Sequence, residues 1–311
     1  MVQTGVQIVE VEPEFAGQRI DNYLMRILKG VPKSRIYRIL RKGEVRRNGG
    51  RIKPEGRLAA GDQIRIPPIR TADEKRTDPN SYWANNIEKT IIYESKLLLI
   101  INKPTGLAVH GGSGISQGVI ESLRLARPNE RHLELVHRLD RDTSGCLMVA
   151  KRRSYLRLLQ QELHGKQKLG KYYRLVTHGH WPSRKVRIEA PLIKNTLQSG
   201  ERVTRVSDDG KPCVTTFKVL ARGAGLSYIE AVPVTGRTHQ IRVHCQHAGH
   251  PILGDPKYGF PDADSGMQVG RLMLHASALS IPALGEHEAV SVTAPMDSTM
   301  QKTVEIFKYN N

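Results

Sequence analysis

The sequence predicts an α+β protein in which a small domain of two helices and a β-hairpin precedes a large domain built on a mixed or antiparallel sheet. The chain has 311 residues, which is more than one average domain needs and suits two domains. Helical spacing and basic charge are concentrated near its start. From Ile91 onward, strand-like runs alternate with turns, without the regular strand–helix alternation of a doubly wound fold.

Four segments divide the chain. Residues 1–16 are predicted as an N-terminal extension, and residues 17–70 as the small basic domain. Residues 71–90 are predicted as a linker, because charged residues, proline and asparagine replace any sustained apolar period there. Residues 91–311 are predicted as the large domain.

Two helices open the small domain. Four aliphatic residues at helical spacing indicate the first: Ile20, Leu24, Ile27 and Leu28. Gly30 ends this pattern. The second helix has Ser34 as its predicted N-cap, an apolar face that includes Ile36 and Ile39, and Gly43 just past its end.

Positive charge is concentrated in the small domain. The whole chain carries 48 Lys or Arg against 30 Asp or Glu, a net charge of +18. Residues 17–70 alone hold 15 Lys or Arg and four Asp or Glu. An excess of this size indicates a polyanionic partner and says nothing about the fold.

One face of the second helix is cationic. Arg35, Arg38 and Lys42 are spaced to form one row, here called the cationic stripe, and Arg41 lies beside it. A solvated surface is the alternative interpretation. Because aligned like charges destabilise an isolated helix, a phosphate-binding face explains the stripe better.

A β-hairpin follows the helices. Strands are predicted at residues 45–48 and 51–53 around a Gly49-Gly50 turn, and a last strand at residues 62–66. This order of elements resembles the S4-type RNA-binding domain, whose paired helices and hairpin grip structured RNA. The resemblance covers about fifty residues and implies an RNA partner without specifying an activity.

The large domain contains several apolar runs bounded by turns. The run at 97–104 indicates a buried strand, and runs at 133–137 and 146–151 indicate strands on either side of a polar loop. An amphipathic helix is predicted at 155–163. Further strands are predicted at residues 173–177, 215–220, 227–232 and 240–245.

The polar loop, residues 137–145, reads His-Arg-Leu-Asp-Arg-Asp-Thr-Ser-Gly. Asp140 follows a predicted strand and lies between two arginines, so we expect it to be ionised, because nearby cations favour the charged form. An oriented carboxylate can act as a nucleophile, a base or an electrostatic stabiliser at a sugar carbon. We assign Asp142 mainly to the structure of the turn.

This loop resembles the signature of the RluA-type pseudouridine synthases, in which the first Asp is the catalytic carboxylate; that position is Asp140. Two more blocks agree in order and spacing, NKPTGLAVHGG at residues 102–112 and VTGRTHQIRVH at residues 234–244, and GHPILGD follows closely. With the S4-like domain in front, the resemblance covers essentially the whole chain.

The resemblance implies a reaction and a substrate. Such enzymes break the N1–C1′ bond of uridine in RNA, turn the base over and rejoin it through C5, so no cofactor is needed. The implied partner is 23S ribosomal RNA of the large ribosomal subunit or its precursors. Asp140 would act at the ribose, either by attacking C1′ or by removing the 2′ proton.

The resemblance also implies roles for further residues. Arg242 matches the arginine that pairs with the catalytic carboxylate. Tyr173 matches the tyrosine that stacks on the base and takes the C5 proton, although Leu175 and the adjacent Tyr172 depart from the family pattern. An ordinary sheet tyrosine is the alternative. Arg138 matches the side chain that fills the gap left by the flipped uridine.

Three other residues are candidates for the site, and no metal is expected there. Arg237 and His239 are predicted to contact RNA or the active site, and Leu274 to belong to the core or the floor of the pocket. Four histidines between positions 239 and 250 could suggest a metal site, but their spacing fits no common zinc arrangement.

Other sequence features bear on location and class. The longest aliphatic run has five residues, at 97–101, whereas a membrane span needs about 20. The first fifteen residues show no secretion signal, and the three cysteines show no disulfide framework. We therefore expect a cytoplasmic monomer with no membrane partner.

Two rival functions remain. A non-catalytic RNA-binding or ribosome-assembly factor would satisfy the charge and the S4-like domain without Asp140. A glycosidase-like enzyme that hydrolyses a nucleoside is the other, although that chemistry usually needs two carboxylates at a defined separation.

Overall fold

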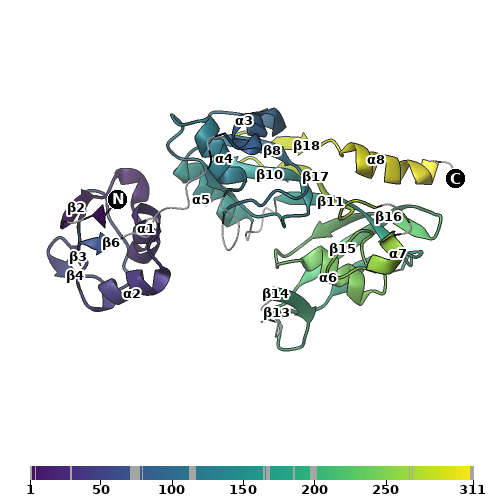
Figure 1. Ribbon diagram of the computed structural model, residues 1–311, viewed down its shortest axis with the longest axis horizontal. Coiled ribbons are helices and arrows are strands. Elements are labelled where there is room, and N and C mark those ends of the chain that lie inside the picture. The colour runs from purple at the N-terminus through teal and green to yellow at the C-terminus, as the bar shows by residue number, and fades with distance from the viewer. Residues whose placement is uncertain are drawn as a thin grey trace. The chain divides into compact units, whose positions relative to one another are not determined.

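The computed structural model describes residues 2–3, 5–28, 30–70, 78, 80–111, 117–163, 165, 169–184, 186–196, 202–265, 267 and 269–308. The chain divides into two compact units, Met1–Thr77 and Asp78–Asn311. Figure 1 shows the elements of each unit. Among the described residues, no helix is both long enough and apolar enough to cross a membrane.

The smaller unit packs two helices against a four-stranded sheet. The helices are α1 (Ile20–Ile27) and α2 (Lys33–Arg41), and the strand order is β2-β5-β3-β4. These strands are β2 (Gln7–Glu10), β3 (Arg46–Arg47), β4 (Gly50–Arg51) and β5 (Gln63–Ile66). A separate pair, β1 (Val2–Gln3) and β6 (Ile69–Arg70), is antiparallel. The aliphatic faces of both helices are buried in one core with β5.

The predicted N-terminal extension, residues 1–16, is wrong for the described part of that segment. Strand β2 pairs with β5, and after it Val11 and Phe15, the latter in the short 3-10 helix η1 (Pro13–Phe15), are buried in the core of the smaller unit. The segment adds a strand to the sheet, and alternate residues of β2 face opposite sides: Val9 packs against the core, whereas Ile8 is exposed.

Two local predictions in this unit also need correction. Helix α2 begins at Lys33, and Pro32 rather than Ser34 holds the N-cap position. Proline is favoured at the start of a helix, because its fixed φ suits the helix and the N–H that it lacks would have no acceptor within the helix there. The hairpin turn is Asn48-Gly49, one residue earlier than predicted; both have positive φ, 48° and 79°, as a two-residue primed turn requires.

The predicted linker is shorter than residues 71–90. Residues 71–77 and 79 lie outside the described residues. Residues 82–90 belong to the larger unit, where they form α3 (Tyr82–Asn86) and the 3-10 helix η2 (Ile87–Thr90). Ser81 caps α3 by accepting a hydrogen bond from the Ala84 N–H at 3.2 Å, and Ile87 is fully buried.

The larger unit is built on a ten-stranded mixed sheet, which confirms the predicted fold class (Figure 1). The strand order is β12-β15-β16-β11-β17-β10-β8-β7, with β18 on β17 and β9 on β10. Only the β10–β17 pair is parallel among these described strands. The strands are β7 (Ile91–Glu94), β8 (Leu98–Lys103), β9 (Glu134–Leu135), β10 (Ser144–Ala150), β11 (Gly170–His178), β12 (Arg187–Glu189), β15 (Val214–Gly223), β16 (Leu226–Pro233), β17 (Leu274–Ile281) and β18 (Val290–Thr293).

Further elements surround this sheet. A separate hairpin pairs β13 (Leu192–Thr196) with β14 (Arg202–Val206). The helices are α4 (Val119–Ala126), α5 (Arg153–Glu162), α6 (Gln240–His247), α7 (Pro261–Ser265) and α8 (Ser298–Glu305), with the 3-10 turn η3 (Ile306–Lys308) after α8. Helix α5 confirms the predicted amphipathic helix, with Leu156 and Leu159 buried.

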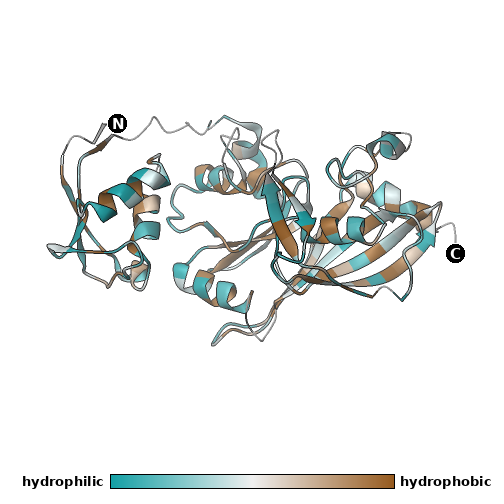
Figure 2. Cartoon of the chain, turned by 90° about the horizontal axis from the view of Figure 1, so that it is seen from below, coloured by the Kyte–Doolittle hydropathy of each residue, from teal (hydrophilic) through white to brown (hydrophobic). Residues whose placement is uncertain are grey.

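The central strands β8 and β10 are buried on both faces. Leu147 and Val149 of β10 point into one hydrophobic core, whereas Cys146 and Met148 point into a second core on the opposite face. This explains why both strands are unbroken apolar runs. Along the strands at the right of Figure 2, apolar and polar residues alternate instead, as expected where one face is less covered.

The strand predicted at residues 240–245 is wrong, because this segment is part of helix α6. The segment reads Gln-Ile-Arg-Val-His-Cys, so polar and apolar residues alternate with the period of a strand, yet all six side chains are buried in the helix. A short run of this kind cannot be assigned by periodicity alone.

Gly145 permits the parallel contact between β10 and β17. Its φ is +108°, and a Cβ built on it would lie 2.2 Å from the carbonyl oxygen of Ala276. Gly145→Ala should therefore lower the free energy of unfolding by roughly 3 kcal/mol or more, through both strain and the clash. Urea denaturation measures the loss. Gly225→Ala is the control, since Gly225 has φ +71° with no atom within 4 Å of such a Cβ, and it should cost only about 1 kcal/mol. Equal losses in the two variants would contradict the close approach.

Candidate active site

A cavity of about 280 Å³ lies where the polar loop, strand β11 and helix α6 meet. The loop between β9 and β10, residues 136–143, supplies one wall, and residues 233–242 supply another. The structure brings together in this cavity seven of the residues that the sequence singles out: Arg138, Asp140, Tyr173, Arg237, His239, Arg242 and Leu274.

The NKPTG segment, residues 102–106, holds the backbone of the polar loop in place. Lys103, fully buried, donates from Nζ to the carbonyl oxygens of Pro104 at 2.8 Å, Leu107 at 2.8 Å and Arg141 at 2.9 Å. Burial lowers the pKa of Lys103 to about 7, whereas Asp142 nearby favours its charged form. Because three acceptors use all three donors of an ammonium group, the contacts also suit the charged lysine. The residue next to Asp140 is thereby held in place.

A buried arginine lies between two carboxylates. Arg242 donates from Nε and Nη2 to the two oxygens of Asp255, at 2.8 and 2.7 Å, and its Nη1 lies 3.6 Å from Oδ2 of Asp140. Burial disfavours the charge on Arg242, but its hydrogen bonds and attraction to Asp255 outweigh burial and raise the pKa of the guanidinium. A permanent positive charge therefore faces Asp140.

The two adjacent tyrosines of β11 point to opposite sides of the sheet, even though the register with β17 shifts between them. Tyr173 lines the cavity and is 9% exposed. Burial, and next the negative charge of Asp140, raise the pKa of its hydroxyl. Tyr172 instead lines a groove on the other face with Arg174 and Tyr228. Only Tyr173 can therefore contact a molecule in the cavity.

Cations and one aliphatic residue complete the cavity. Arg138 and Arg237 are exposed there, so both can contact a bound anion. Lys171 of β11 adds a third basic group, and burial lowers its pKa. Leu274, at the start of β17, is buried in the core and also lines the cavity, as predicted.

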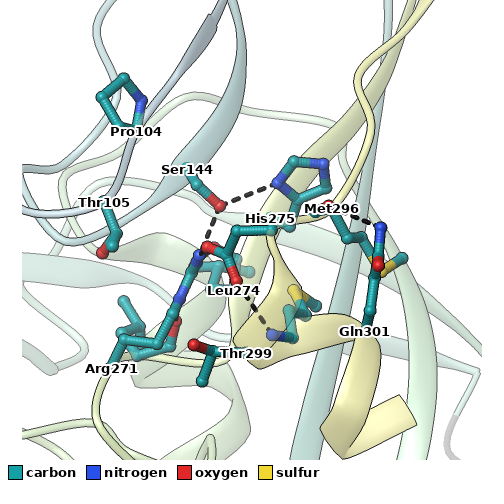
Figure 3. Close-up of polar contacts among 12 residues, drawn as sticks. Pro104, Thr105, Ser144, Arg271, Leu274, His275, Met296, Thr299 and Gln301 are labelled. Atoms are coloured by element: carbon teal, nitrogen blue, oxygen red, sulfur yellow. Dashed lines mark hydrogen bonds and ion pairs between the residues drawn. The ribbon is translucent and has the colours of Figure 1, made fainter. Parts of the chain in front are cut away.

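A hydrogen-bonded network fixes the end of the polar loop (Figure 3). The carbonyl oxygen of Ala294 accepts from Nε2 of His275 at 3.0 Å, so His275 Nδ1 must accept the hydroxyl of Ser144 at 2.8 Å. Arg271 donates to the same hydroxyl at 2.7 Å and forms an ion pair with Asp297. Asp297 caps helix α8 by accepting a backbone N–H. This network connects α8 to the residue at which β10 begins.

The predicted RNA-binding cations of the smaller unit lie on and next to helix α2. Arg38, Arg41 and Lys42 are exposed, and Arg35 is half-buried. They belong to the other compact unit and do not line the cavity. Their role in RNA binding stays a prediction.

Sequence reasoning missed three residues that build the site: Lys103, Asp255 and Tyr258. Lys103 and Asp255 lie inside the quoted blocks NKPTGLAVHGG and GHPILGD. A charged residue within a block of motif residues was the signal that the sequence offered. Tyr258 donates or accepts at His239 Nδ1, 2.7 Å away, and no sequence pattern reveals this contact.

The histidines near α6 are engaged with other protein groups. His244 contacts the Thr215 hydroxyl and the Ala190 carbonyl oxygen, and His250 contacts the His178 carbonyl oxygen. Within the described part of the chain, no group of three or more His, Cys, Asp or Glu side chains could hold a metal ion. The predicted absence of a metal stays a prediction.

Two known families match the chain, one in each compact unit. Residues 97–247 match the family described as RNA pseudouridylate synthase, and residues 18–64 match the S4 domain. The larger unit thus contains the pseudouridine synthase domain, and the smaller unit is an S4 domain.

Curated relatives match over nearly the whole length. Ribosomal large subunit pseudouridine synthase C of Salmonella typhimurium is 52% identical over 98% of this chain and 97% of its own. The enzyme of the same name from Escherichia coli is 52% identical over 97% of this chain and 96% of its own. The chain belongs to the RluA-type pseudouridine synthases.

A solved structure agrees with the fold of the larger unit. Human RNA Pseudouridylate Synthase Domain Containing 4 superposes with a TM-score of 0.59 at 26% identity, covering 72% of this chain and 95% of that one. Human RNA Pseudouridylate Synthase Domain Containing 1 gives 0.56 at 25% identity, covering 75% and 98%.

The opposite orientation of the two tyrosines gives a direct test. Tyr173→Phe keeps the ring in the cavity and removes the hydroxyl, so turnover should fall by ~10²- to 10⁴-fold if that hydroxyl accepts the C5 proton. Tyr172→Phe is the matched control and should remain within a few-fold of the unmodified protein. Pseudouridine formation in RNA is the measurement. Full activity of Tyr173→Phe would limit this residue to stacking and packing.

Proposed function

We propose that this protein converts uridines of large-subunit ribosomal RNA, the 23S RNA of bacteria, to pseudouridine, with Asp140 as the catalytic carboxylate. The names of the curated relatives support the choice of RNA, since ribosomal large subunit pseudouridine synthase C is 52% identical to this chain. The cationic surface of α2 and the S4 domain match support a structured RNA partner.

The reaction is an isomerisation and balances without a co-reactant. The N1–C1′ bond of uridine breaks, a C5–C1′ bond forms, the proton on C5 leaves and N1 gains a proton. Asp140 acts at the ribose, by attacking C1′ or by removing the proton on C2′. In either case its carboxylate must be negatively charged and must reach the sugar.

The observation that carries this proposal is the placement of Asp140. Its side chain is only 18% exposed, lines the cavity, and lies 3.6 Å from a guanidinium that two hydrogen bonds to Asp255 hold rigidly. A fixed positive charge stabilises the carboxylate without protonating it, because arginine does not lose its proton in proteins. The cavity volume is close to the lower end of the range of small-molecule sites, about 300–1,000 Å³.

Other residues of the cavity bind the base, the phosphate and the neighbouring part of the RNA. Tyr173 offers a neutral aromatic face for the base, since burial raises the pKa of its hydroxyl. Arg138 occupies the space that the flipped uridine leaves, and Arg237 contacts phosphate. Leu274 forms the apolar floor.

The structure disfavours the hydrolytic rival. Hydrolysis of a glycosidic bond usually needs a second carboxyl group at a defined separation from the first. Among the described residues that line the cavity, Asp140 is the only acidic one, and Asp255 is paired with Arg242 through both of its oxygens. Release of free uracil from RNA would restore this rival.

A bacterial ribosomal RNA substrate would place the protein in the cytoplasm, as expected from the sequence. This location and the monomeric state stay predictions, as does the choice of particular uridines.

Asp140→Asn tests the chemistry. The change keeps the side-chain volume and removes the charge, so pseudouridine formation should fall below detection, whereas RNA affinity should change by less than about tenfold because binding depends on cations elsewhere. Asp142→Asn is the matched control, since Asp142 is 35% exposed and faces Arg141 at 3.5 Å; it should keep activity within a few-fold. Measurable conversion by Asp140→Asn would refute the assignment. RNA binding without any conversion by the unmodified protein would instead favour the rival of a non-catalytic RNA-binding factor.

The cationic stripe is tested by salt dependence. Replacing Arg35, Arg38 and Lys42 with Gln should weaken RNA binding and reduce the slope of log affinity against log salt by roughly 0.7–0.9 for each lost phosphate contact. A triple Gln variant at the exposed Arg184, Lys218 and Lys302 removes the same charge from the larger unit and should leave most of the slope intact. Identical slopes in the stripe variant and the unmodified protein would mean that the stripe is only a solvated face.

A further inference from the structure

His239 has an unusual backbone that directs its ring into the cavity. Its φ of 54° and ψ of 22° are left-handed, a conformation that non-glycine residues rarely adopt. It occupies the N-cap position of α6, and its side chain lines the cavity together with Asp140. A strained position of this kind is retained where the surroundings fix it, which is common at functional sites.

The hydrogen bonds of Tyr258 suit a His239 ring whose proton is on Nε2. The Thr204 backbone N–H donates to Oη of Tyr258 at 2.9 Å, and His239 Nδ1 lies 2.7 Å from the same oxygen. Because the phenol already accepts from Thr204, its own proton is free to bond Nδ1. Nδ1 is then the acceptor, and the proton of the neutral ring is on Nε2.

The charged groups around the ring are consistent with this neutral form. Burial lowers the pKa of His239; Asp140 and Asp255 oppose this shift, and Arg242 and Lys257 add to it. A neutral imidazole has one N–H. With Nδ1 as the acceptor, this N–H is on Nε2, the nitrogen that lies 3.8 Å from Oδ1 of Asp140.

The N–H of His239 and the carboxylate of Asp140 are close but too far apart to bond each other. His239 Nε2 lies 3.8 Å from Asp140 Oδ1, whereas an N–H···O hydrogen bond spans about 2.7–3.2 Å. Both side chains are partly exposed at the cavity, 16% and 18%. A donor and an acceptor separated in this way fit one group that both accepts and donates a hydrogen bond. A hydroxyl does both, whereas a carbonyl oxygen only accepts and an N–H only donates.

We propose that His239 and Asp140 together bind the ribose 2′-hydroxyl of the target uridine, with His239 Nε2–H donating to it and the carboxylate accepting from it. The 2′-hydroxyl is next to C1′, where the reaction occurs, and uracil itself carries no hydroxyl. The pair therefore distinguishes RNA from DNA at the reacting nucleotide. Tyr258 is a positioning residue, because it fixes the tautomer of His239 and contacts no substrate. This inference depends on the proposed function.

The experiment uses synthetic RNA fragments of the large-subunit sequence around a uridine that the unmodified protein converts. Each fragment carries either uridine or 2′-deoxyuridine at that one position, and single-turnover rates of isomerisation are measured with the full chain. The ratio of the ribose rate to the deoxyribose rate reports the 2′-hydroxyl contact. For the unmodified protein we expect a ratio of at least about 10², since a site built to bond a hydroxyl rejects the analogue that lacks it.

Two amide variants of His239 isolate the N–H. Gln places an N–H about as far from the backbone as Nε2, whereas Asn is one methylene shorter and reaches only the position of Nδ1. Asn also tolerates the left-handed backbone, so His239→Asn should fold. His239→Asn should slow conversion of the uridine fragment and reduce the ratio by at least tenfold, with little further loss on the deoxyuridine fragment. His239→Gln should keep more of the ratio than His239→Asn.

Tyr258→Phe tests the positioning role separately. It keeps the ring that lies 5.1 Å from the guanidinium of Arg242 and removes only the hydroxyl. The ratio should fall, though less than in His239→Asn, because the ring of His239 stays but its tautomer is no longer fixed. A ratio that is unchanged in His239→Asn would overturn the inference. Failure of the unmodified protein to convert any uridine would instead overturn the proposed function, so the two failures are distinguishable.

Discussion

The rest of the site depends on the placement of one buried arginine, Arg242, between Asp255 and Asp140. An unpaired charge at its depth, 3% exposed, would cost several kcal/mol of unfolding free energy. Asp255, fully buried, removes that cost with two hydrogen bonds and also accepts the backbone N–H groups of Lys257 and Tyr258. The same contact thus shapes the chain after α6 and leaves Nη1 of Arg242 facing Asp140.

Contacts distant in sequence fix the part of the polar loop that follows Asp140. Lys103 and Thr105, next to β8, bond the carbonyl oxygens of Arg141 and Asp142, and Ser144 bonds into the network of Arg271. Functional residues often lie on loops, although loops are more mobile than the strands they join, so such a residue needs a rigid scaffold. Here the backbone carbonyls immediately after Asp140 are held by buried donors, so the side chain gains the rigidity of the sheet.

Much of the fold and of the chemistry could be predicted from sequence, and the failures have physical causes. The apolar runs of β8 and β10 identified the central strands, and the blocks around Asp140 and Arg242 identified residues that do meet in one cavity. Helix α6 was missed because its first six residues alternate polar and apolar like a strand, while the fold buries the polar ones as well. Asp255 and Tyr258 were missed because their roles come from contacts with Arg242 and His239, which only the tertiary structure creates.

An enzyme that acts on a polyanion through a carboxylate must hold a negative charge next to a negatively charged substrate. Asp140 and Asp255 are two negative charges against the single positive charge of Arg242, so the interior of the site would repel phosphate. Arg138 and Arg237 supply the missing positive charge where they are exposed to solvent, and Lys171 supplies more inside. In the proposed function, the exposed cations and the S4 domain attract the RNA backbone. The interior can keep a negative charge because the sugar and the base that it would receive are uncharged.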